Sequence, residues 1–143
     1  MSGTNKAFFD TNILLYMYGG ADPQKRLCAR ELFGRCAADG SILLSTQVIQ
    51  EFYAAGSRKL GMPPAELREA VAALLDLPFV VVSAGEITSA IHAEGRYKIS
   101  FWEALILAAA ESGGAAVLYT EDLSDGQQYG PVRVTNPFLS TLS

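Results

Sequence analysis

The sequence predicts an α/β fold, a single domain in which helices cover both faces of a mainly parallel sheet of four to five strands. Short apolar runs of strand length alternate with longer segments of helix length along the chain. The strand-length runs are continuously apolar, which is typical of parallel strands buried on both faces. The length of 143 residues suits one domain, and no repeat or linker divides it. We therefore expect residues 1–143 to form one unit.

The first half of the chain predicts two strands and three helices. Gly19 and Gly20 end the first helix, and Pro23 begins the second, which Gly40 ends. Thr46 is the expected N-cap of the third helix. The elements are strand 7–9, helix 11–18, helix 23–39, strand 41–45 and helix 46–60.

The second half continues the alternation. Pro63 and Pro64 precede a short helix, which we interpret as an insertion within the domain. Ser100 and Glu103 form the S-x-x-E pattern of a capping box at the start of a later helix. The last strand is expected at an edge of the sheet, because prolines bracket it. The elements are helix 65–76, strand 79–82, helix 85–97, helix 101–112, strand 116–119, an acidic loop 120–127 and a possible fifth strand 132–134.

Composition narrows the function classes. The 15 acidic and 11 basic residues give a net charge of −4, which argues against holding nucleic acid by bulk charge alone. An enzyme that meets phosphates through bound cations stays compatible. The longest apolar run, 104–110, is too short to span a membrane, and no signal-peptide pattern is present, so we expect a cytoplasmic protein. Cys28 and Cys36 should stay reduced, since on one helix they would lie about 12 Å apart.

Four acidic residues follow or adjoin predicted strand ends. Asp10 and Asp122 come directly after the first and fourth strands, Glu51 lies in the helix after the second, and Glu103 lies in the first turn of the helix before the fourth. Ligands of open α/β sheets bind at the carboxyl ends of the strands. Each residue alone has an ordinary explanation as a cap, a turn residue or an exposed helix residue. The apolar neighbours of Glu51 and Glu103 favour carboxylates with partners.

Converging carboxylates need a counter-charge, because like charges raise one another's pKa. Oxygen ligands without histidine or thiolate indicate a hard cation, Mg²⁺ or Mn²⁺, which can activate water and neutralise phosphate oxygens. The single histidine, His92, excludes a His–His acid–base pair and is interpreted as an ordinary helix residue. Without the four candidates, 11 acidic residues balance 11 basic ones.

These segments resemble the motifs of a known family. The opening strand with its D-T-N sequence, residues 8–16 (FFDTNILLY), resembles that of PIN-domain ribonucleases. Residues 49–53 (IQEFY), 99–106 (ISFWEALI) and 118–123 (LYTEDL) resemble their second, third and fourth acidic motifs. The match covers nearly the whole chain, and the most similar subgroup is the VapC-type toxins of bacterial toxin–antitoxin pairs.

The resemblance implies a metal-dependent endoribonuclease that uses Mg²⁺ or Mn²⁺ and cleaves RNA. It also implies a homodimer and a cognate antitoxin that blocks the site. Glu103 stands where the family usually has Asp. Carried over residue by residue, Asp10, Glu51, Glu103 and Asp122 are the catalytic and metal-binding set. Asn12 and Thr120 are supporting hydrogen-bonding residues, and Asp125 is an outer ligand through water. Arg58, Lys59, Arg96 and Lys98 are candidates to meet the RNA backbone.

Three other classes of function are compared with the ribonuclease interpretation. A catalytically silent PIN-fold module that binds RNA or protein is supported by Glu103. A phosphoryl-transfer enzyme generally requires D-x-D, and here the third position is Asn12. A receiver-like domain requires adjacent acidic residues, and Asp10 stands alone. We further expect Glu103 to point into the pocket while Ser100 caps the helix alone, and a homodimer to form through Phe52, Tyr53, Leu60 and Met62.

Overall fold

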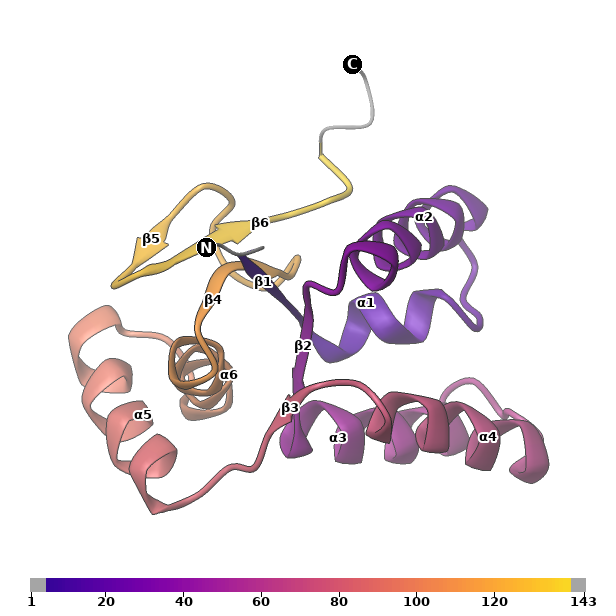
Figure 1. The fold of residues 1–143 in the computed structure, drawn as a ribbon, viewed down its shortest axis with the longest axis horizontal. Helices are drawn as coiled ribbons and strands as arrows, with labels where there is room; N and C mark the ends of the chain where they lie inside the picture. Colours follow the sequence, from indigo (N-terminus) through magenta and orange to yellow (C-terminus); the bar gives the residue numbers. More distant parts are fainter. Residues whose placement is uncertain (1–4, 140–143) are drawn as a thin grey trace.

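The computed structural model describes residues 5–139, and these form a six-stranded sheet in the order β3-β2-β1-β4-β6-β5 (Figure 1). Every neighbouring pair is parallel except β5 and β6. In the centre, Phe8 pairs with Leu43 on one side and with Leu118 on the other. This confirms the predicted α/β class. The strands are β1 (Lys6–Phe9), β2 (Ile42–Ser45), β3 (Phe79–Val80), β4 (Ala115–Tyr119), β5 (Gln128–Tyr129) and β6 (Val132–Thr135).

The sheet has one strand more than the four to five that the sequence predicts. The predicted edge strand is β6, and it lies inside the sheet, between β4 and β5. The added strand β5 holds only two residues, so it has no apolar run by which it could be recognised. Gly130, with a φ of 57°, makes the tight turn that brings β5 back along β6.

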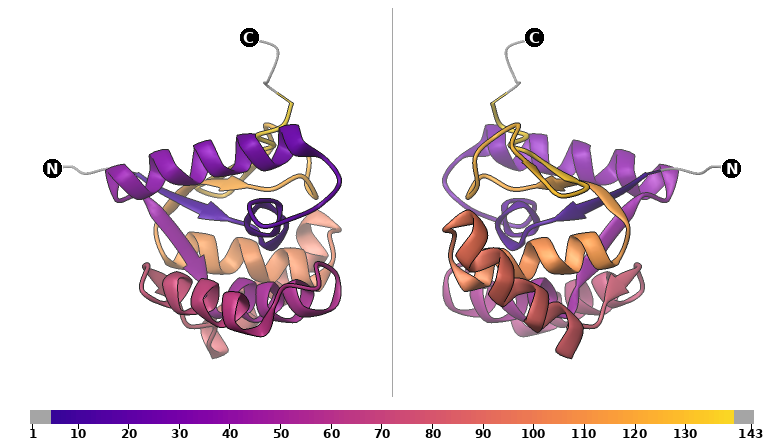
Figure 2. Two further views of the ribbon diagram at one scale, coloured as in Figure 1. Left: turned by 90° about the vertical axis from the view of Figure 1, so that its right-hand side faces the viewer. Right: turned by 90° about the vertical axis from the view of Figure 1, so that its left-hand side faces the viewer.

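Helices cover both faces of the sheet. Figure 2 shows α2 on one side and α3, α4 and α6 on the other. The helix α5 packs mainly against α6, and at its end the ring of Tyr97 contacts that of Tyr129 in β5. The helices are α1 (Thr11–Tyr16), α2 (Pro23–Asp39), α3 (Thr46–Arg58), α4 (Pro64–Leu75), α5 (Ala84–Tyr97) and α6 (Phe101–Ser112).

The N-cap of α3 is Ser45, one residue before the expected Thr46. Ser45 ends β2 with the extended backbone that an N-cap requires, and its Oγ accepts a hydrogen bond from the N–H of Val48 at 3.3 Å. Thr46 is already the first helical residue, and its Oγ1 accepts a hydrogen bond from the N–H of Val82 at 3.1 Å. The strand therefore passes into the helix without a loop, and this places the first turn of α3 at the edge of the sheet.

Two of the four residues predicted for a dimer surface lie in the core, so this prediction was wrong for Phe52 and Met62. Phe52 is fully buried and Met62 is 7% exposed. Leu60 is half-buried, and only Tyr53 is largely exposed. Met62 contributes to the core because the short connection between α3 and α4 folds back onto the two helices.

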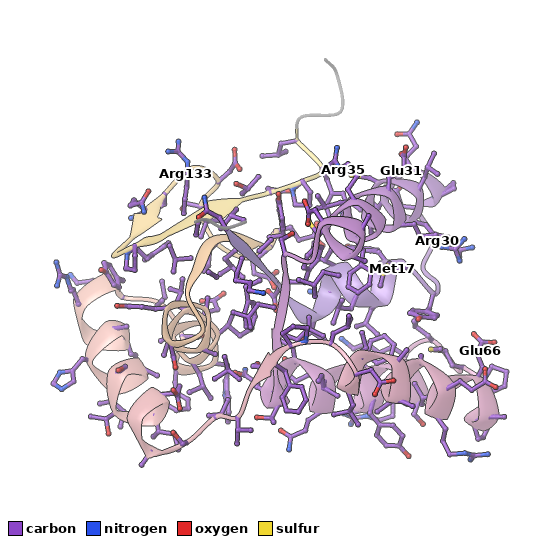
Figure 3. All side chains as sticks on the ribbon, in the orientation of Figure 1. Met17, Arg30, Glu31, Arg35, Glu66 and Arg133 are labelled. Carbon is purple, nitrogen blue, oxygen red and sulfur yellow. The ribbon has the colours of Figure 1, made fainter. Side chains whose placement is uncertain are left out.

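The helix α1 is short, and α2 holds its far end. The Nε of Arg30 on α2 donates a hydrogen bond of 2.8 Å to the carbonyl oxygen of Met17, which follows α1 (Figure 3). Cys28 and Cys36 on α2 are free thiols, as expected, and His92 is exposed on α5. Within residues 5–139, no helix combines the length and the apolar character needed to cross a membrane.

Candidate active site

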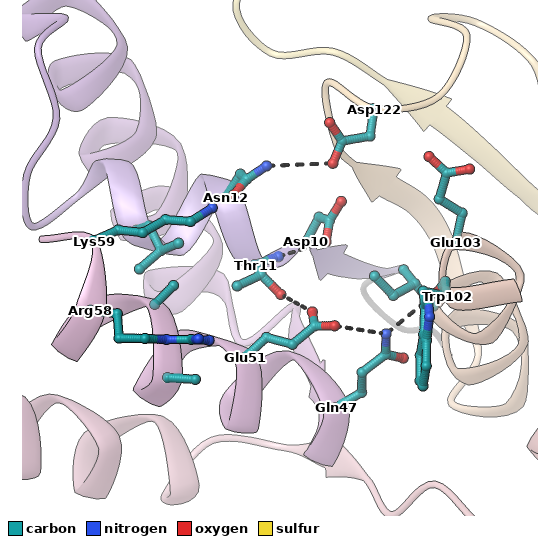
Figure 4. Close-up of a pocket in the computed structure, with 14 residues that line it drawn as sticks. Asp10, Thr11, Asn12, Gln47, Glu51, Arg58, Lys59, Trp102, Glu103 and Asp122 are labelled. Carbon is teal, nitrogen blue, oxygen red and sulfur yellow. Dashed lines mark hydrogen bonds between the residues drawn. The ribbon is translucent and has the colours of Figure 1, made fainter. Parts of the chain in front are cut away.

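A cavity of about 330 Å³ opens at the carboxyl ends of β1 and β4. The elements that meet there are α1, α3, the start of α6 and the loop after β4. Figure 4 shows the side chains around it. All four predicted acidic residues, Asp10, Glu51, Glu103 and Asp122, line this one cavity.

Asp10 lies at the base of the site, directly after β1, and is only 7% exposed. Its Oδ1 accepts a hydrogen bond from the N–H of Thr11 at 2.7 Å, and its Oδ2 accepts one from the hydroxyl of Thr120 at 2.7 Å. Burial raises the pKa of Asp10 to about 6, although these two hydrogen bonds lower it. The charges of Asp122 and Glu51 raise it further. Asp10 is thus a buried carboxyl that two negative neighbours destabilise in its charged form.

Glu51 is held in place by α1 and by its own helix. The hydroxyl of Thr11 donates to its Oε1 at 2.7 Å, and the Nε2 of Gln47 donates to its Oε2 at 3.2 Å. The same Nε2 also donates to the carbonyl oxygen of Trp102 at 3.4 Å. Glu51 therefore has a fixed orientation at the point where α1, α3 and α6 meet.

Asp122 enters the cavity from the loop after β4. Thr120, which is 1% exposed, accepts a hydrogen bond from the N–H of Asp122 at 3.1 Å while donating to Asp10. The side-chain amide of Asn12 donates to Oδ2 of Asp122 at 3.5 Å. Burial and the adjacent charge of Glu121 raise the pKa of Asp122. Thr120 thus links the two aspartates, and Asn12 contacts the second.

Glu103 caps α6, contrary to the expectation that Ser100 would do so alone. The Oε1 of Glu103 accepts a hydrogen bond from the N–H of Ser100 at 3.1 Å, and Ser100 Oγ accepts one from the N–H of Glu103 at 3.1 Å. Both halves of the capping box are therefore present. The side chain still lines the cavity, and no hydrogen bond within residues 5–139 involves its Oε2.

Within residues 5–139, no three carboxylates converge closely enough to form a ready-made metal-binding group. The hydrogen bonds to Glu51 and Glu103 explain this, since they hold two of the four carboxylates toward other partners. Asp125 does not line the cavity. Its Oδ1 accepts a hydrogen bond from the N–H of Asn136 at 2.7 Å, and its role as an outer ligand stays a prediction.

The basic candidates separate into two groups. Arg58 and Lys59, at the end of α3, line the cavity (Figure 4). Arg96 and Lys98 lie at the end of α5 and do not line it. The guanidinium of Arg96 packs over the ring of Tyr97, with 5.4 Å between them. Positive charge at the cavity therefore comes from the end of α3.

The sequence analysis missed Gln47, which lines the cavity, and three residues outside the cavity that support the loop of Asp122. Gln47 stands four residues before Glu51, a spacing that puts both on one helix face and could have identified it. Lys25 pairs with Glu121, with 2.9 Å between Nζ and Oε2, and Tyr16 donates a hydrogen bond to the same carboxylate. No local sequence pattern predicts these contacts, because about a hundred residues separate Glu121 from Tyr16 and Lys25. Together they attach the loop of Asp122 to α1 and α2.

Comparisons with solved structures agree with this fold. A toxin–antitoxin complex from Klebsiella pneumoniae has a TM-score of 0.70 at 22% identity, covering 92% of this chain and 98% of that one. VapC20 of Mycobacterium tuberculosis, a toxin that cleaves the sarcin–ricin loop, has a TM-score of 0.66 at 20% identity, with coverages of 82% and 90%. VapBC2 from Rickettsia felis, bound to a DNA fragment from its promoter, has a TM-score of 0.65 at 16% identity, with coverages of 90% and 96%.

Among curated protein sequences, no significant match was found. The family model of the PIN domain matches residues 7–124. This range runs from β1 to the loop after β4 and includes all four acidic residues of the cavity. The chain therefore belongs to the PIN domain family.

Proposed function

We propose that this protein is a divalent-metal-dependent endoribonuclease and the toxin of a toxin–antitoxin pair. The observation that carries the proposal is one cavity that combines four carboxylates with Arg58 and Lys59. Carboxylates suit a cation, and the two basic side chains suit the phosphates of a nucleic acid. Membership of the PIN family and the similarity in fold to toxin–antitoxin proteins support the same function.

The residues of the cavity fit Mg²⁺ or Mn²⁺ by their chemistry. The side chains that line it and could bind a cation offer oxygen atoms, chiefly of carboxylates, and neither histidine nor cysteine is among them. Burial, together with the charges of neighbouring carboxylates, raises the pKa values of Asp10 and Asp122, so their charged forms are destabilised and a bound cation would stabilise them. Asp10, Glu51, Glu103 and Asp122 would hold the ion. When bound, a divalent ion supplies an activated water and charge neutralisation at the phosphate.

The chain itself supplies binding and orientation. Arg58 and Lys59 bind the phosphates that flank the cleaved bond. Thr120 fixes the positions of Asp10 and Asp122 relative to each other through its two hydrogen bonds. Thr11 and Gln47 hold the carboxylate of Glu51. This preorganisation limits the movement needed when charge develops on the phosphate.

The test is cleavage of total RNA by purified protein with Mg²⁺, with Mn²⁺ and with EDTA. We expect cleavage only with the metals, and its loss in Asp122→Asn. Glu94→Gln, which removes an exposed carboxylate of α5 outside the cavity, is the matched control and should cleave like the parent protein. If RNA stays intact under all conditions while Mg²⁺ binds, the catalytically silent module becomes the better assignment.

The toxin role predicts two further properties. Expression of the protein in the cytoplasm of a bacterial host should arrest the growth of that host. A cognate antitoxin should relieve the arrest by blocking the cavity. A homodimer remains part of the proposal, without the surface first predicted for it, because Phe52 and Met62 lie in the core. Light scattering at tens of micromolar protein tests the dimer, and a monomer there would contradict it.

A further inference from the structure

Trp102 is a large apolar side chain that the fold leaves exposed. It is 62% exposed, although it sits in the first turn of α6, whose later residues are buried. The same side chain lines the cavity of the carboxylates and directly precedes Glu103 in the sequence. An exposed indole beside these carboxylates does not contribute to the core, so its position suits a ligand with an apolar face.

The opposite wall of the cavity carries positive charge. Arg58 and Lys59 extend from α3 on the side facing Trp102 and Glu103 (Figure 4). Within residues 5–139, neither forms an ion pair. The cavity therefore offers cations on one wall and an aromatic ring on the other. A nucleotide carries the matching groups, a phosphate and a base with a π-face.

The indole is also held by its surroundings. The carbonyl oxygen of Trp102 accepts a hydrogen bond from Gln47, and the ring of Phe101 packs edge-to-face against the indole, with 5.1 Å between the ring centres. Gln47 also binds Glu51, so one amide positions the Trp102 backbone and a cavity carboxylate together. An anchored aromatic ring loses little entropy when a base stacks on it.

We propose that Trp102 is a stacking subsite for an unpaired base of the RNA, next to the cleaved phosphate. This inference rests on the proposed ribonuclease function and adds to it one residue, Trp102, that would contact a base of the substrate. A base must leave its helical stack before a protein side chain can cover its face, so a continuous duplex does not fill the subsite. The stacking is tolerant of base identity, because every base has a π-face.

The fluorescence of Trp102 gives a direct test, since it is the single tryptophan of the chain. The protein carries Asp10→Asn to prevent cleavage and is titrated with a randomised pool of single-stranded RNA of about ten nucleotides. We expect the RNA to quench the tryptophan fluorescence. An abasic strand of the same length, or a base-paired duplex, should quench much less.

Substitutions give the second readout, with binding followed by the anisotropy of labelled RNA. Trp102→Leu should weaken binding roughly 5- to 150-fold, and Trp102→Phe should restore most of the affinity. Tyr53→Ala is the matched control, because Tyr53 is a comparably exposed aromatic residue outside the cavity and its loss should leave binding unchanged. In the protein that keeps Asp10 and therefore cleaves RNA, Trp102→Leu should raise KM more than it lowers kcat.

The outcomes separate the two proposals. If the parent protein cleaves RNA while Trp102→Leu keeps its KM and RNA causes no quenching, the stacking subsite is wrong and the ribonuclease stands. If the Trp102→Leu protein cleaves RNA normally but the antitoxin no longer inhibits it, the indole contacts the antitoxin and not a base. If the parent neither binds nor cleaves RNA, the ribonuclease proposal fails, and the stacking subsite fails with it.

Discussion

The buried carboxyl of Asp10 should make the metal-free protein less stable at neutral pH than at acidic pH. Burial raises its pKa from the usual 3.8 to about 6, so the folded state keeps the proton at pH values where the unfolded state has lost it. The resulting stabilisation is fully present below the unfolded pKa and is lost as the pH rises through the folded pKa. Asp10→Asn removes this dependence, because the amide does not titrate.

The size of the effect follows from the two pKa values. At about 1.4 kcal/mol per pKa unit, the rise from 3.8 to about 6 corresponds to about 3 kcal/mol over the full titration. About 2 kcal/mol of this lies between about pH 4.5 and about pH 7.5. The new amide also faces the hydroxyl of Thr120, and rearranging that hydrogen bond costs about 1 kcal/mol at every pH. The quantity to measure is therefore the difference in free energy of unfolding between the parent and Asp10→Asn. The reasoning predicts how this difference changes with pH, and a constant cost of the substitution does not affect that change.

The measurement is chemical denaturation in EDTA across this pH range, with parent, Asp10→Asn and the control Glu94→Gln. We expect the stability of Asp10→Asn relative to the parent to rise by about 2 kcal/mol toward neutral pH, and that of Glu94→Gln to stay flat. Added Mg²⁺ should stabilise the parent and have little effect on Asp10→Asn. Parallel stability curves for parent and Asp10→Asn would refute the reasoning, because Asp10 would then titrate alike in both states.

Three further predictions concern the residues around the site and the packing beneath it. Glu103→Gln should keep the hydrogen bond to Ser100 and change the free energy of unfolding by less than about 0.5 kcal/mol while weakening Mg²⁺ binding. Glu103→Asp should keep or raise RNA cleavage. Calorimetric titration and a cleavage assay test these variants, and an unchanged Mg²⁺ affinity in Glu103→Gln would mean that Glu103 only caps the helix. Thr120→Val should destabilise the protein by about 1–3 kcal/mol and raise the pKa of Asp10 further, because it removes the hydroxyl that serves both aspartates; denaturation across pH tests this, with Thr120→Ser as the rescue. Gly113→Ala should cost about 1–3 kcal/mol in thermal or chemical unfolding, since its Cβ would lie 2.5 Å from the side chain of Leu43. Gly34→Ala on α2, where no atom of residues 5–139 lies within 4 Å of the added Cβ, should stabilise the protein by about 0.5–1 kcal/mol, and equal effects of the two substitutions would contradict the packing argument.

Much of the fold was predictable because its signals are local. Pro23 and Gly40 bound α2 at the predicted residues, since a proline suits the first helical turn and a glycine adopts the left-handed conformation that ends a helix. The apolar runs of β1, β2 and β4 mark strands buried on both faces. Asp10 directly follows β1 and Asp122 lies in the loop after β4, and these positions are enough to expect both at one edge of the sheet.

The remaining features depend on contacts between segments far apart in the chain. The two residues of β5 become a strand only because β6 lies beside them, and β6 is an inner strand only because β4 pairs with its other side. Phe52 and Met62 are apolar residues that the sequence analysis assigned to a dimer surface, and the packing of α3 and α4 buries them within the chain. Hydrophobicity and local propensity do not specify which partner a residue meets.

The sequence by itself therefore determined the fold class, the family and the set of carboxylates, because these follow from short patterns along the chain. Only the tertiary structure decided how each carboxylate is held. Glu51 is bound through Thr11, and Thr120 joins Asp10 to Asp122 across about a hundred residues of sequence. It also decided that Trp102 faces the cavity instead of the core. The physical reason is that hydrogen bonds and burial are set by distances in space, and folding creates those distances between residues that no local pattern connects.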